Sequence, residues 1–175
     1  MTQLEIHLGG DDLVVVTDSG TDSSARRCLP AGTARLLTEA LLGDPPLPEE
    51  LTNAIGWVVD HLDDLVLERP DLLGSATTVS GVGAVAIAAV EVGGDPPLPF
   101  LLTRHAAEDV FRTVVTEPSS DRRLNPGLAA DLVHEVVAAA CVVVGLMRRL
   151  HLDDLMICDR ADQTAPIIES DRPAP

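Results

Sequence analysis

The stretch Leu4–Val16, LEIHLGGDDLVVV, decides how the rest of the chain can be organised. Its apolar residues alternate on either side of Gly9 and Gly10, which predicts two short strands folded back on each other with one buried face. His7 falls on the opposite face. Glycines at such a turn let backbone amides approach an anion closely, because no Cβ stands in the way. The hairpin is therefore a first candidate anion site.

The two residues that follow these glycines, Asp11 and Asp12, oppose anion binding. Two like charges about 4 Å apart repel by roughly 4 kcal/mol at an effective dielectric constant near 20, which is about a thousandfold in affinity. Three interpretations stay open: a plain hairpin turn, a residual anion site, or Asp12 as a magnesium ligand. The third needs substrate phosphates, because one or two carboxylates do not complete the shell of Mg²⁺.

Composition limits the partners that the chain can have. It has 175 residues, enough for one domain, and a formal net charge of −16; all 12 basic residues are Arg. Such a surface repels nucleic acid and anionic lipid, so we expect neither as a partner. The residues MTQLEIHLGG do not resemble a signal peptide, and the apolar run Val136–Met147 is too short to span a bilayer. We expect a cytoplasmic protein.

The cysteines fit this expectation. Cys28, Cys141 and Cys158 are widely spaced, and two of them lie in apolar runs. This pattern favours buried free thiols in a reducing compartment over a metal site.

The remaining chain predicts further elements in a definite order. They are a third strand over Ser23–Pro30, a helix from Thr33 to Gly43, a long helix opening at Pro48, a β-prone run over Asp71–Ser80, an apolar helix over Ala84–Val92, a helix capped by Thr103, the most apolar helix over Leu128–Leu150 and a last strand over Leu155–Cys158. Trp57 is expected to pack where the long helix meets the sheet. The order predicts one α/β domain over residues 1–162, with a mixed sheet of about five strands flanked by helices. Residues 163–175, rich in Pro and acidic side chains, are expected to be loosely ordered.

The segment Gly81–Gly83 is a second candidate anion site. A strand, a glycine turn and a helix in this order expose backbone amides at the start of the helix. No other catalytic signature is present in the sequence. No G-x-S-x-G segment presents a nucleophile, and His134-Glu135 lacks the second histidine of a zinc-protease helix.

A set of short motifs recurs in the order seen in one protein family. The set comprises Pro30-x-Gly32-x-x-Arg35-Leu36, Asp44-Pro45-Pro46, Glu49-Glu50-Leu51, Leu102-Thr103-Arg104, Glu108-Asp109-Val110, Asp121-Arg122-Arg123, Pro126-Gly127-Leu128 and Met147-Arg148-Arg149. With these motifs the chain resembles the second half of the exopolyphosphatase and guanosine pentaphosphate phosphohydrolase family, in its actinobacterial form. The resemblance implies a single actin-like, ribonuclease H-type lobe. It also implies a hydrolase that holds polyphosphate, or a pentaphosphate guanine nucleotide, with a divalent metal between two lobes.

The sequence departs from the family pattern where the chemistry should lie. The family segment Asp-x-Gly-Gly-Gly-Ser-Thr-Glu falls on His7–Asp12, so that its aspartate is His7 and its third glycine is Asp11. The phosphate-binding hydroxyls of the second loop fall on apolar residues of Gly81–Val85. The arginine and aspartate expected before the most apolar helix fall on Leu132 and His134. We therefore expect Gly9, Gly10, Gly81 and Gly83 to be vestigial phosphate-binding residues, and Asp11 or Asp12 to be the acids that could associate with a metal.

Three hypotheses follow from this combination. The first is a catalytically inactive lobe that acts as a binding or assembly module, as a homodimer or with a full-length relative, with a phosphate-containing small molecule as a possible ligand and no cofactor. The second is a residual polyphosphate or guanosine pentaphosphate phosphohydrolase, completed by another chain and using Mg²⁺, with Asp11 or Asp12 as the acid. The third is a remnant without a selected function.

Overall fold

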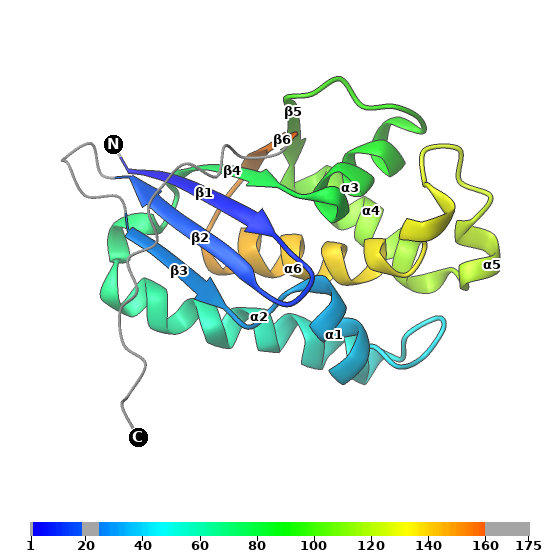
Figure 1. Cartoon of the computed structure of the whole chain (residues 1–175), viewed down its shortest axis with the longest axis horizontal. Helices are drawn as coiled ribbons and strands as arrows, with labels where there is room; N and C mark the ends of the chain where they lie inside the picture. The colour runs from blue at the N-terminus through cyan, green and yellow to red at the C-terminus, as the bar shows by residue number, and fades with distance from the viewer. Residues whose placement is uncertain (1, 19–24, 160–175) are drawn as a thin grey trace.

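The computed structural model describes residues 2–18 and 25–159, which form one mixed sheet covered by helices (Figure 1). The six strands are β1 (Gln3–Leu8), β2 (Leu13–Asp18), β3 (Ala25–Leu29), β4 (Ala76–Ser80), β5 (Phe100–Thr103) and β6 (Asp154–Cys158). Their order across the sheet is β3-β2-β1-β4-β6-β5. Strands β1, β4 and β6 run parallel to one another, and the other neighbours pair antiparallel. The predicted hairpin is confirmed, since Leu8 pairs with Leu13 across the turn.

The alternation in the hairpin sets which face of the sheet is buried. Leu4, Ile6 and Leu8 are buried, whereas the alternate residues Gln3 and Glu5 are exposed. The buried strand residues join one hydrophobic cluster with the inward faces of the helices. These helices are α1 (Thr33–Glu39), α2 (Pro48–Glu68), α3 (Val82–Val92), α4 (Arg104–Thr116), α5 (Ser119–Arg122) and α6 (Glu135–Arg149).

Helix α6 lies at the centre of the helical layer. Every residue from Val136 to Met147 is buried, and the helix contacts α1, α2, α3 and α4. This explains why it is the most apolar helix of the sequence and confirms its predicted central position. Over the residues that the structure describes, no helix is both long and apolar enough to cross a membrane.

The observed elements correct several predictions. The sheet has six strands instead of about five, because β5 is an edge strand of four residues that becomes extended by pairing with β6. Helix α6 begins at Glu135 rather than Leu128, since the residues before it form a loop with a short 3₁₀ turn at Ala130–Leu132. Helix α1 ends at Glu39, short of Gly43.

Other predictions fall on single side chains. Thr103 caps α4 as predicted, its hydroxyl accepting a hydrogen bond from the amide of Ala106 (3.2 Å). Trp57 packs against the core, and its indole donates to the carbonyl of Pro30 (2.9 Å). Cys141 is buried as predicted, and burial raises the pKa of its thiol to about 12. Cys28 is exposed, because it lies on edge strand β3 and its side chain points away from the helices. The predicted tail over residues 163–175 lies outside the described residues.

Candidate functional site

The candidate site lies at the edge of the sheet where the parallel strands end. The connection Gly9–Asp12 follows β1, Gly81 follows β4 and Asp159 follows β6. In open α/β sheets, ligands bind beyond the carboxyl ends of the strands. Helices α3, α4 and α5 gather beyond the tips of β1 and β4 (Figure 1).

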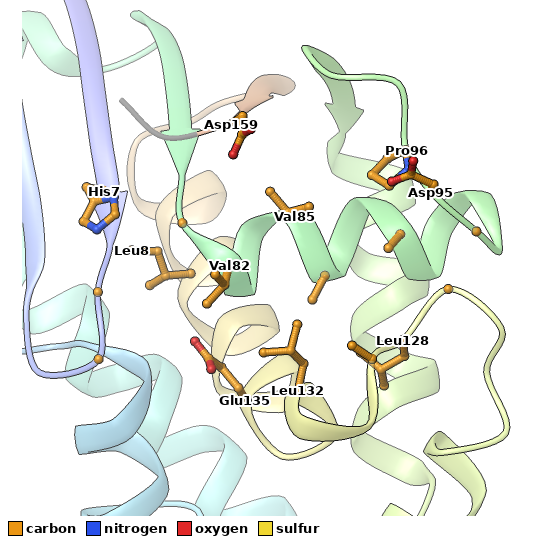
Figure 2. A pocket seen from close by; sticks show the side chains of 18 of the residues that line it. His7, Leu8, Val82, Val85, Asp95, Pro96, Leu128, Leu132, Glu135 and Asp159 are labelled. Atoms are coloured by element: carbon orange, nitrogen blue, oxygen red, sulfur yellow. The ribbon is translucent and has the colours of Figure 1, made fainter. Parts of the chain in front are cut away.

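A cavity of about 1010 Å³ opens at this edge, and Figure 2 shows it from close by. We call this cavity the cleft. Its lining residues are His7, Leu8, Gly9, Gly10, Gly81, Val82, Val85, Ala86, Ala89, Gly94, Asp95, Pro96, Pro126, Gly127, Leu128, Ala129, Leu132, Glu135 and Asp159. Its volume is at the upper end of the range typical of small-molecule sites. The cleft brings together three of the four predicted vestigial glycines, Gly9, Gly10 and Gly81.

The first glycine loop is a four-residue connection closed by a hydrogen bond from the amide of Gly9 to the carbonyl of Asp12 (3.1 Å). Its carbonyls face the start of α1. The amide of Thr33 donates to Gly9 (3.0 Å), and the amide of Ala34 donates to Gly10 (2.8 Å). Within the described part of the chain, the amides of Gly10 and Asp11 donate to no partner. Two amides of this loop are thus available to an acceptor outside the described residues.

The second glycine loop is fixed by close packing. Gly81 has φ of 116°, and a Cβ on it would lie 2.4 Å from the carbonyl oxygen of Leu8. Gly83 does not line the cleft: it is buried in α3, where a Cβ would lie 2.8 Å from the Cβ of Ala139. Both glycines are therefore required by backbone and helix packing, whether or not a phosphate binds.

Glu135 is the residue that sequence reasoning missed. It occupies the first turn of α6, and its carboxylate accepts a hydrogen bond from the hydroxyl of Thr33 (3.2 Å). The same carboxylate lies 3.5 Å from the point where a Cβ on Gly83 would stand, next to the start of α3. Figure 2 shows it pointing toward Val82, at the end of the cleft that the glycine loops form. An acidic residue opening the most apolar helix was the only signal available in the sequence.

His7 lines the same end of the cleft from β1. It pairs with Ser80 across the parallel strands β1 and β4, and its Nδ1 lies 3.2 Å from the hydroxyl of Ser80. Ser80 is only 1% exposed, so this hydroxyl is not accessible to a substrate. The pair is a structural contact between neighbouring strands.

Asp11 and Asp12 do not line the cleft. Asp11 is exposed at the tip of the hairpin, and its carbonyl accepts hydrogen bonds from the amide of Gly32 (3.1 Å) and the guanidinium of Arg35 (3.3 Å). Among the described residues no group of three or more His, Cys, Asp or Glu side chains could hold a metal ion. The carboxylates present therefore do not fit a magnesium site by themselves.

A buried arginine holds the loop that forms the far wall of the cleft. Arg122 is 2% exposed and donates to the carbonyls of Val133 (2.9 Å) and Val114 (2.8 Å) and to the carboxylate of Asp44 (2.7 Å). We call these residues the Arg122 cluster. Asp44 is partly desolvated, which raises its pKa, but hydrogen bonds from Ser119 and Arg122 outweigh this and lower the pKa below its usual value. The cluster fixes the chain on both sides of Pro126–Leu132.

The charge of the cleft is unfavourable for phosphate. Its described lining holds three carboxylates, Glu135, Asp95 and Asp159, and no Arg. Phosphate sites need donors and positive charge aimed at the oxygens. The free amides at the start of α3 supply partial positive charge, but the nearest side-chain charge there is the carboxylate of Glu135.

Comparison with known proteins confirms the resemblance stated from the motifs. Exopolyphosphatase 1 of Mycobacterium leprae is 26% identical over 161 residues, which are 89% of this chain and 47% of that protein. Exopolyphosphatase 1 of Mycobacterium tuberculosis is 27% identical over the same share of this chain. The chain spans about half the length of these curated relatives. No model of a known protein family matches it.

Solved structures confirm the fold. The Aquifex aeolicus Ppx/GppA phosphatase superposes with a TM-score of 0.79 at 19% identity, over 90% of this chain and 53% of that one. An exopolyphosphatase-like protein gives a TM-score of 0.80 at 17% identity, over 91% of this chain and 55% of that one. The chain therefore has the α/β fold of an actin-like lobe, at about half the length of these structures.

Proposed function

We propose that this chain is a catalytically inactive relative of the exopolyphosphatases that acts as a binding module. The observation that carries the proposal is the position of Glu135: its carboxylate lies beside the start of α3, between the two glycine loops, where a phosphate would otherwise meet the backbone amides. A phosphate there would be repelled by this carboxylate by roughly 4 kcal/mol at contact distance and an effective dielectric constant near 20. The cleft keeps its shape while its charge opposes the family's substrates.

The scaffold around the cleft supports a retained binding role. Gly81 meets the backbone of β1, and the Arg122 cluster satisfies the guanidinium with protein acceptors. Buried polar groups without partners destabilise a fold, so this pairing holds the wall of the cleft in place. A well-formed cavity with a few polar groups is the usual form of a small-molecule site.

The assembly and location of the chain belong to the same proposal. The cleft leaves Val82 60% exposed, so a second copy or a full-length relative would bury apolar surface by covering it. The cysteines Cys28, Cys141 and Cys158 are free thiols, which is consistent with a cytoplasmic location.

The decisive experiment measures phosphate release from polyphosphate and from guanosine pentaphosphate with Mg²⁺. We expect the purified chain to release no more phosphate than the buffer does. Release that depends on the chain and is lost on Asp12→Ala would instead support the residual phosphohydrolase.

A binding measurement tests the role of Glu135 directly. We expect short-chain polyphosphate with Mg²⁺ to leave the Tm of the native chain unchanged and to raise the Tm of Glu135→Gln, because the neutral amide removes the repulsion. A ligand at a hundred times its Kd stabilises a fold by about 2.7 kcal/mol, which is a shift of a few degrees. Equal shifts for both proteins would show that Glu135 does not block the site.

A further inference from the structure

We propose that the cleft binds an aliphatic diamine or polyamine, with one ammonium group at Glu135, a second at Asp95 and the hydrocarbon chain along α3. This inference names the ligand class of the binding module proposed above and rests on that proposal. Three features of the cleft carry it: an apolar floor, carboxylates near both of its ends, and a described lining in which no Arg occurs and His7 is the only basic side chain.

The floor of the cleft is one face of α3. Val82, Val85, Ala86 and Ala89 all line the cavity and follow each other at helical spacing, i, i+3, i+4 and i+7. This row offers no hydrogen-bond donor or acceptor from a side chain. It can therefore contact methylene groups without loss of hydrogen bonds, whereas a polyphosphate chain placed there would lose hydration along its whole length.

The two carboxylates lie at opposite ends of this floor. Figure 2 shows Glu135 beside the first turn of α3 and Asp95 above the C-terminal half of the helix, where the loop that follows α3 folds back, with Val85 between them. At a rise of 1.5 Å per residue, the helix from Gly83 to Val92 is about 14 Å long. Because Asp95 lies back over the helix, this length is the upper limit for the spacing of the two ammonium groups, and a three-carbon diamine is much shorter than it.

Other ligand classes fit the cleft less well. An inorganic divalent cation needs several oxygen ligands at one point, and no group of three candidate ligands exists among the described residues. An anion would meet three carboxylates and no Arg among the described lining residues. A monoamine with a hydrocarbon body satisfies one end only, so we expect it to bind more weakly than a diamine of the same length.

The test compares amines of different length and charge by isothermal titration calorimetry on the full chain at one fixed ionic strength. The probes are 1,8-diaminooctane, spermidine, 1,3-diaminopropane, octylamine and magnesium chloride. We expect the two long polyamines to bind, octylamine to bind about tenfold more weakly, and 1,3-diaminopropane and Mg²⁺ to give no saturable heat.

Variants distinguish binding of the amine in the cleft from unspecific attraction of cations to a chain with a net charge of −16. Glu135→Gln and Asp95→Asn should each weaken 1,8-diaminooctane about tenfold, whereas Asp64→Asn, an exposed acid on α2 that does not line the cleft, should leave binding unchanged. Val85→Trp should abolish binding by filling the floor. Glu135→Gln keeps an oxygen that can accept the hydrogen bond from Thr33, so we expect this variant to fold. A circular dichroism melt verifies that each variant is folded.

Equal binding of all cations, or equal losses in Asp64→Asn and Glu135→Gln, would overturn the inference in favour of unspecific charge screening. Saturable binding that tolerates Val85→Trp would also overturn it, because the ligand would then lie elsewhere. Phosphate release by the chain would contradict the proposed function without bearing on these titrations, so the two failures can be told apart.

Discussion

The Arg122 cluster and the cleft lie on the two sides of the same loop, and they use charge in opposite ways. In the cluster, a guanidinium that is 2% exposed donates to three carbonyls and to the carboxylate of Asp44. In the cleft, Glu135 has a single hydrogen-bond partner among the described residues, the hydroxyl of Thr33, and faces open volume. A charged group whose hydrogen-bonding positions are all used within the protein stabilises the fold. A charged group with unused hydrogen-bonding positions can still bind a ligand.

This difference explains why some residues of the chain match the family pattern and others depart from it. Arg122 and Gly81 remain because their removal would leave polar atoms unpaired or force a Cβ into backbone. His7 stands where the family pattern has an aspartate, and Val82 lies in the loop where it has phosphate-binding hydroxyls; the fold tolerates both residues because they line the cleft. The comparison therefore predicts large stability effects in the first set and small ones in the second.

Arg122→Met should give the largest effect. It removes four hydrogen bonds that the buried guanidinium donates, one of them to the partly exposed Asp44; at about 1 kcal/mol for each bond the loss should be about 3 to 5 kcal/mol. The free energy of unfolding in urea measures it. Arg123→Met is the matched control: Arg123 is the exposed neighbour, and its replacement should change stability by less than about 0.5 kcal/mol. Similar losses in both variants would contradict the structural role of the cluster.

Gly81→Ala should be the next largest. Its Cβ would lie 2.4 Å from the carbonyl oxygen of Leu8, in a backbone conformation that only Gly adopts readily. Gly74→Ala provides the control, since Gly74 also has positive φ, 67°, but nothing lies within 4 Å of its Cβ position. We expect Gly74→Ala to cost about 1 to 2 kcal/mol and Gly81→Ala to cost clearly more. Equal Tm shifts would mean that the contact with β1 relaxes freely.

Acidification should weaken the Arg122 cluster through Asp44. The pKa of Asp44 is lower in the folded chain than in the unfolded one, so its contribution is fully present above the unfolded pKa, about 3.8, and is lost as the pH falls toward the folded pKa. The unfolding free energy of Asp44→Asn should therefore fall less steeply between about pH 5 and pH 3 than that of the native chain. Parallel curves would show that Asp44 does not titrate differently on folding.

Glu135→Gln should have the smallest effect on stability, within about 0.5 kcal/mol, because the amide oxygen still accepts from Thr33 and the side chain faces the cleft. The same urea titration measures this change. A loss comparable to that of Arg122→Met would place Glu135 among the residues that hold the fold, and the contrast between the two regions would disappear.

Much of the fold was predictable because its signals are local. Alternation in Leu4–Val16 gave the hairpin and its buried face, and Pro48 marked the start of α2. Strand β5 was missed because four residues carry no periodicity of their own, and the start of α6 was misplaced because Leu128 and Leu132 continue an apolar pattern through a loop. Both errors concern elements whose conformation depends on partners distant in the sequence.

The candidate site divides in the same way. The glycines at the ends of β1 and β4 could be identified from sequence, since Gly9 and Gly10 lie in a predicted hairpin turn and Gly81 lies between a predicted strand and a predicted helix. That Gly83 packs against Ala139 instead of lining the cleft, and that Asp11 and Asp12 lie outside it, could not.

By itself, the sequence determined the α/β class, the resemblance to the exopolyphosphatases and the acidic character of the chain, because these follow from local pattern, ordered motifs and composition. Only the tertiary structure decided which charges meet. Glu135 is 102 residues from Thr33 in sequence, yet their side chains are hydrogen-bonded at the mouth of the glycine loops. Electrostatic interactions depend on distance in space and on the surrounding solvent, and neither can be read from separation along the chain.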